Sequence, residues 1–183
     1  MMKYVITIPL VLLVTLVQTG AAPSFHFMGA RPDLVVVFLA CWAMIRSQEE
    51  LLVLLSVAGA SLGLIGAEPF GVALIALAPI GLLTGLKDTR IMEGEFLPAL
   101  LVVFAASLAY NTLFLVTLQL TGQEAHWLRS IFWIFLPGAL LNVLVASLLY
   151  WPIRWVGGAL GGERVQAPEV APWWLLRRGR SSR

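Results

Sequence analysis

The chain has 183 residues, of which 60% are hydrophobic and 12% are charged, and its mean hydropathy is +0.90. Soluble domains carry about 25% charged residues, so this composition excludes an ordinary soluble domain. The formal net charge at pH 7 is only +2, and the single cysteine, Cys41, excludes an intrachain disulfide and a cysteine-based metal site.

Six apolar runs follow one another along the chain. They are Tyr4 to Ala22, Pro32 to Ile45, Leu51 to Ile65, Phe70 to Leu86, Leu97 to Leu120 and Ile131 to Val156. A straight helix needs about 20 apolar residues to cross a membrane. The runs therefore predict an all-α integral membrane protein, with six transmembrane helices in residues 1–162 and a separate basic tail in residues 163–183.

The second and third runs are shorter than a straight crossing needs, and only Arg46 to Glu50 join them. Two arrangements fit this pattern. The runs form two crossings, lengthened by residues 25–29 and by Gly66 and Ala67, or they form a helical hairpin that does not reach both faces. We favour two crossings.

The basic residues are distributed unevenly between the connections. With six crossings and the N-terminus inside, ten lie inside, namely Lys3, Arg46, Lys87, Arg90, Arg154, Arg164, Arg177, Arg178, Arg180 and Arg183, and two lie outside, Arg31 and Arg129. Cytoplasmic loops carry an excess of Lys and Arg. We therefore expect a multi-pass protein of the bacterial inner membrane with both termini in the cytoplasm.

The C-terminal tail is predicted to begin where a glycine-rich segment, residues 157–162, ends the sixth helix. Two tryptophans then precede a basic cluster, and together they are Trp173, Trp174, Arg177, Arg178 and Arg180. These residues form either an anchor on anionic lipid or a disordered tail that serves mainly as a topology signal.

The predicted spans contain few groups capable of chemistry. These spans hold no carboxylate pair, metal-ligand cluster, phosphate-binding loop or nucleophile beside a base, so we expect no enzyme activity and no cofactor. The amide of Asn142 lies in the middle of the sixth run, where such groups usually bridge helices. Glycines four residues apart line one face of a helix and allow close packing, and they are Gly59, Gly63, Gly81 and Gly85.

Three stretches of the chain resemble the MreD family of bacterial rod-shape proteins. Arg31-Pro32-Asp33 opens an apolar run as the family's RP(N/D) segment does. Residues 59–71 are similar to the family's GxxxDxxSGxxxG segment in length and in the first and last glycines, but Gly63 stands at the Asp position and Gly66-Ala67 replaces Ser-Gly. Residues 136–152 are similar to the family's last helix. The resemblance covers the chain up to about Gly162.

This resemblance implies a non-enzymatic component of the machinery for lateral cell-wall synthesis. The family's partner is MreC, a single-span membrane protein, and both are linked to RodA, its class B penicillin-binding protein and the MreB filament. Besides membrane lipid, we therefore expect MreC as the partner and no nucleic acid. The outer connections that are free to touch MreC carry Glu68, His126, Trp127 and Arg129.

The family is also similar in fold to the substrate-binding subunits of energy-coupling-factor transporters. This similarity raises an alternative function, a subunit that binds a small solute such as a vitamin. Such a subunit needs a polar pocket near the outer ends of its helices, and the sparse candidates are Asp33, Glu68, Asn111 and Asn142.

Overall fold

The computed structural model describes residues 2–20, 31–66, 71–84, 96–120, 122 and 130–159. Within these residues the chain forms six helices and no strand. They are α1 (Met2–Gly20), α2 (Leu34–Ile45), α3 (Gln48–Ile65), α4 (Val72–Thr84), α5 (Phe96–Leu120) and a last helix in which the π-helical turn η3 (Ile131–Phe135) continues into α7 (Leu136–Ala159). The predicted all-helical fold with six helices is confirmed.

Three of the six helices are long and apolar enough to cross a membrane. These are Gln48–Ile65, Phe96–Leu120 and Ile131–Ala159, whereas the other three have apolar stretches of 10 to 17 residues. With a rise of about 1.5 Å per residue, the 12 residues of α2 extend about 18 Å. The hydrocarbon core of a bilayer is about 30 Å thick, so α2 does not cross it as a straight helix.

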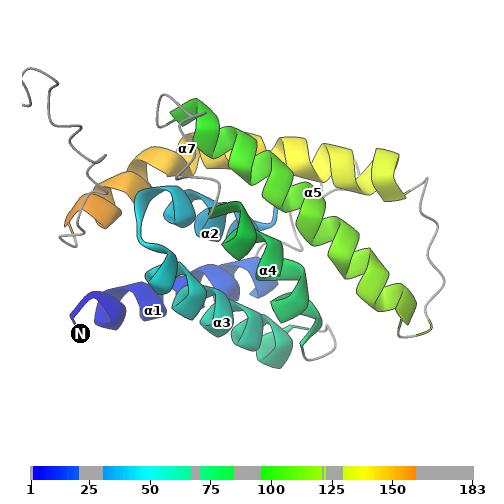
Figure 1. Cartoon of the computed structure of the whole chain (residues 1–183), viewed down its shortest axis with the longest axis horizontal. Helices are drawn as coiled ribbons and strands as arrows, with labels where there is room; N and C mark the ends of the chain where they lie inside the picture. The colour runs from blue at the N-terminus through cyan, green and yellow to red at the C-terminus, as the bar shows by residue number, and fades with distance from the viewer. Residues whose placement is uncertain are drawn as a thin grey trace, which may run out of the picture.

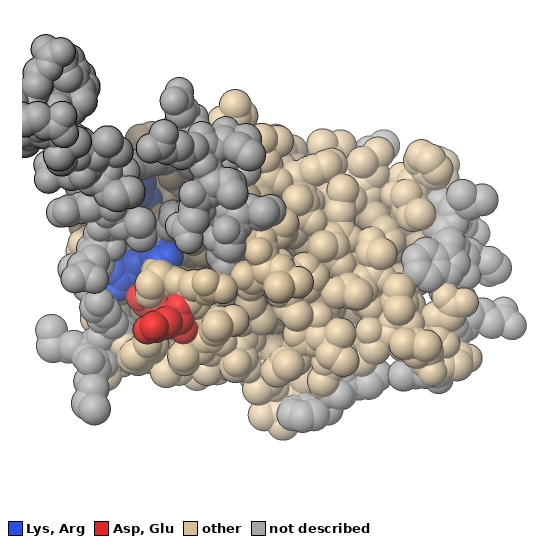
Figure 2. Space-filling view, viewed as in Figure 1, with Lys and Arg blue, Asp and Glu red and all other residues tan. Residues whose placement is uncertain are grey.

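Successive helices run in alternating directions through the bundle (Figure 1). The first residue of α1, the turn between α2 and α3 and the last turn of α7 all lie at the same end, on the left of the view. On the face shown in Figure 2, the described charged side chains also gather at this end, while the rest of the described surface is uncharged.

Helix α2 is the centre of the bundle. It contacts each of the other described helices, and its residues 35–43 are all buried. Every residue from Leu34 to Ile45 is apolar or weakly polar, and a helix that is apolar on all sides is stable only when it is surrounded. The short second run of the sequence therefore becomes the core of the molecule.

Two helix ends can be compared with the boundaries predicted from the sequence, and one of them differs. Helix α3 begins at Gln48, so the connection to α2 is only Arg46 and Ser47. Helix α7 ends at Ala159, inside the glycine-rich segment 157–162 that was predicted to end the sixth helix. A Cβ atom on Gly157 would lie 2.9 Å from Cγ2 of Ile45, so this glycine allows α7 to approach the end of α2 closely.

Candidate functional site

The N-terminus of α2 is held by side chains from other helices. The amide of Asn142 on α7 is fully buried. Its Oδ1 accepts a hydrogen bond of 2.8 Å from the backbone N–H of Asp33, and its Nδ2 donates one of 3.0 Å to Oγ of Ser107 on α5. One side chain therefore joins three helices.

Gln18 on α1 makes a second contact of this kind. Its Oε1 accepts a hydrogen bond of 2.7 Å from the backbone N–H of Val35. The side chain of Asp33, the N-cap residue, makes no capping bond of its own. The first N–H groups of a helix have no partner within the helix, and here α1 and α7 supply the acceptors that α2 needs inside the bundle.

Other polar side chains inside the bundle make hydrogen bonds to their own helix or to a neighbouring one. Ser61 on α3 donates a hydrogen bond of 3.2 Å to Oγ1 of Thr15 on α1, and Thr15 donates one of 2.9 Å to the carbonyl oxygen of Val11. Nδ2 of Asn111 bonds to the carbonyl oxygen of Ser107 in the same helix. These contacts make the small polar residues part of helix packing.

A buried charged cluster lies at the turn between α2 and α3. Nε of Arg46 is 3.2 Å from Oε2 of Glu50, and both side chains are almost fully buried. The contact is an ion pair without the alignment of a hydrogen bond. The guanidinium also lies 5.9 Å from the centre of the Trp42 ring. Among the described residues, Trp42 Nε1, Arg46 Nη2 and Glu50 Oε1 have no hydrogen-bond partner.

Two of the four predicted packing glycines lie at contacts between α3 and α4. A Cβ atom on Gly59 would lie 2.9 Å from Cα of Leu74, and one on Gly81 would lie 3.4 Å from Cδ2 of Leu52. Gly63 is half-buried on α3, and Gly85 lies outside the described residues. The backbones of α3 and α4 therefore approach each other closely at Gly59.

The outer face of α7 carries a continuous row of exposed large residues. Its members follow one another at intervals of three or four positions, and they are Leu140, Leu144, Leu148, Trp151 and Trp155. Leu148 and Trp155 each have an exposed fraction of 77%. This spacing keeps the row on one side of the helix, so α7 presents an unbroken apolar surface away from the bundle.

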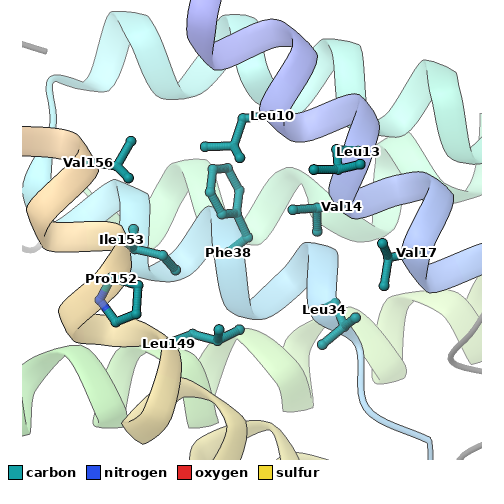
Figure 3. A pocket seen from close by; sticks show the side chains of 10 residues that line it. All are labelled: Leu10, Leu13, Val14, Val17, Leu34, Phe38, Leu149, Pro152, Ile153 and Val156. Atoms are coloured by element: carbon teal, nitrogen blue, oxygen red, sulfur yellow. The ribbon is translucent and has the colours of Figure 1, made fainter.

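An apolar groove lies between α1, α2 and α7 (Figure 3). Leu10, Val14 and Val17 form one wall, Leu149 and Ile153 belong to the opposite wall, and Phe38 of α2 points between them. The cavity volume is about 250 Å³, and no polar side chain lines it. No local pattern in the sequence predicts this groove, because it depends on how far apart α1 and α7 lie on either side of α2.

Most other predicted site residues lie outside the described residues. These are the outer-connection residues Glu68, His126, Trp127 and Arg129 and the tail residues Trp173, Trp174, Arg177, Arg178 and Arg180. In the described ranges, no group of three or more His, Cys, Asp or Glu side chains is arranged to hold a metal ion.

Comparisons with known proteins identify the family. The family described as rod shape-determining protein MreD matches residues 1–156. No curated protein and no solved structure matches the chain, so the expected similarity in fold to energy-coupling-factor subunits stays a prediction. Because the match covers most of the sequence and the described residues form the helices of a membrane protein, the chain belongs to the MreD family of rod shape-determining membrane proteins.

Proposed function

We propose that this chain is a non-enzymatic membrane component of the bacterial rod complex that binds the transmembrane helix of MreC. Through MreC it helps to organise RodA and its class B penicillin-binding protein, and more distantly MreB, for lateral peptidoglycan synthesis. The observation that carries this proposal is the family match over residues 1–156.

The use of polar groups within the described bundle supports a role in helix binding. The side chains of Asn142, Gln18 and Ser61 make hydrogen bonds to neighbouring helices. The groove between α1, α2 and α7 offers no polar side chain to a solute. Helix–helix packing is therefore the activity that the described residues support best.

The outer row of α7 is the contact surface that we propose for the partner helix. Ser147 lies beside this row and is half-buried, so the surface contains a small residue next to the large Leu and Trp residues. Membrane helices associate through close packing around small residues. The row also extends over most of the longest apolar helix that the structure describes, so it faces a partner helix over much of its length.

The test of the proposal is co-purification from cells that express this chain together with MreC. The pair should elute together in mild detergent, and MreC without its transmembrane helix should not be retained. Separation of the full-length pair, with tight binding of a small vitamin by this chain alone, would favour the solute-binding alternative.

Substitutions test the contact surface separately. Leu144→Trp and Leu148→Trp keep the row apolar but change its shape, and they should weaken retention of MreC about tenfold, which corresponds to about 1.4 kcal/mol. Leu101→Trp on α5 is the matched control, because Leu101 is also exposed and lies on another helix. An equal effect of all three substitutions would exclude the outer row of α7 as the specific contact.

A further inference from the structure

We propose that the groove between α1, α2 and α7 is a binding site for one acyl chain of a membrane phospholipid. The groove belongs to a membrane protein, and its lining consists entirely of hydrocarbon side chains. The part of a ligand that occupies it must therefore be hydrocarbon as well, because a polar group would find no hydrogen-bond partner there.

The dimensions of the groove fit one flexible chain. The wall on α1 extends from Leu10 to Val17, which is about 10 Å along the helix axis. The cavity volume is about 250 Å³. One water molecule takes about 30 Å³ of the liquid, so this volume corresponds to about eight groups of that size.

The lining favours an acyl chain over the helix of a partner protein. Membrane helices approach one another where small residues leave room for the backbone. The close approaches within this bundle follow that rule, at Gly59 against Leu74 and at Gly157 against Ile45. The groove is lined only by Leu, Val, Ile, Phe and Pro. A slender chain can lie between these side chains, whereas a helix backbone would remain too far away.

An exposed tryptophan marks the end of the groove at which the lipid headgroup would lie. Leu10 and Val156 lie at this end, and Val17 and Leu34 lie at the other (Figure 3). Trp155, which is exposed, adjoins Val156, and tryptophan prefers the headgroup level of a bilayer.

The bound chain would complete the packing of α1. Helix α1 packs mainly against α3, and α7 packs mainly against α5 and α2. Phe38 on α2 lies between the two outer walls and stacks on Trp42 with ring centres 5.3 Å apart. An acyl chain next to Phe38 would contact both walls and supply the dispersion contacts that an empty groove lacks.

Native mass spectrometry of the full chain, released from phospholipid membranes in mild detergent, tests this inference. The chain should retain one phospholipid. Val14→Trp fills the groove from α1 and should lower the retained lipid about tenfold, since the added ring takes the space of the acyl chain. Leu16→Trp is the control, because Leu16 is exposed and does not line the groove. Equal lipid retention by both variants would overturn the proposal.

Two further measurements keep the result clear if Val14→Trp does not fold. Leu149→Trp fills the groove from α7 and should also lower lipid retention. A phospholipid with a photoreactive acyl chain should cross-link to residues 10–17 and 149–156 of the unchanged chain, in preference to the exposed Leu97 and Leu101 of α5. If the groove variants retain lipid but lose MreC, the groove holds the partner helix, and the proposal is wrong.

Discussion

The amide of Asn142 has a structural importance that its residue type alone does not reveal. Its two polar atoms contact α2 and α5 from a position on α7 that is fully buried. Replacing it by an apolar residue leaves the backbone N–H of Asp33 without this acceptor. A buried donor without a partner costs about 1 to 3 kcal/mol.

We therefore expect Asn142→Leu to lower the thermal unfolding temperature of the protein in detergent. Asn111→Leu is the matched control, because the Asn111 amide bonds to Ser107 within the same helix and to no other helix that the structure describes. The free energy of unfolding should fall by about 1 to 3 kcal/mol for Asn142→Leu, and by clearly less for the control. Similar losses for both substitutions would contradict the bridging role of Asn142.

At the scale of the helices, the contact between α3 and α4 depends on the absence of a side chain at Gly59. Alanine is usually favoured over glycine in a helix by about 1 kcal/mol. At Gly59 the added Cβ would lie 2.9 Å from the backbone of Leu74, so the two helices must separate. Overpacking of this kind costs about 1 to 3 kcal/mol.

Gly59→Ala should therefore lower the unfolding temperature, whereas Gly158→Ala should leave it unchanged or raise it. A Cβ atom on Gly158 meets no atom within 4 Å, so only helix propensity acts there. Thermal unfolding of both variants in the same detergent measures the difference. A stabilising effect at Gly59 would show that α3 and α4 do not meet as described.

The turn between α2 and α3 gives a second prediction at this scale. Arg46 follows the C-terminus of α2, and Glu50 lies in the first turn of α3, so each charge complements its helix dipole. Arg46→Leu leaves Glu50 buried without its ion-pair partner and should destabilise the protein by about 3 to 5 kcal/mol.

The double variant Arg46→Leu/Glu50→Leu should recover much of this loss, because no buried charge remains without its partner. Chemical or thermal unfolding of both variants measures the coupling between the two residues. A double variant that is less stable than Arg46→Leu alone would argue against the ion pair as the source of the effect.

At the scale of the whole molecule, the arrangement of the helices bears on membrane topology. The N-terminal end of α1 and the C-terminal end of α7 lie at the same end of the bundle (Figure 1). The topology expected from the sequence assigns ten of the twelve basic residues to the side that holds the termini, so we predict that both termini are cytoplasmic.

Labelling of single introduced cysteines with an impermeant reagent checks this orientation. His126→Cys should be labelled in intact cells, and Arg180→Cys should be labelled only after permeabilisation. Cys41 has no exposed surface, so the reagent should not label it in either case. Labelling at position 180 in intact cells would overturn the predicted orientation.

The sequence was sufficient to predict the helices, but it did not predict several of the contacts between them. Apolar runs predicted six helices, and the isolated amide of Asn142 predicted a bridge. Arg46 and Glu50 belonged to a polar connection in the sequence, and only the short turn places them as a buried pair. The bond from Val35 to Gln18 joins residues 17 positions apart, on different helices, and no local pattern encodes it.

The central position of α2 also has a consequence for biosynthesis. The second helix to leave the ribosome is surrounded in the finished protein by α1 and by helices that are made later. The bond between Asp33 and Asn142 joins positions 109 residues apart, so α2 acquires this acceptor only after most of the chain has been translated. Until then, α2 is a short apolar segment with an incompletely paired end inside the bilayer, where unpaired backbone groups are costly. Correct insertion of α2 is therefore completed late, when the last helix joins the bundle.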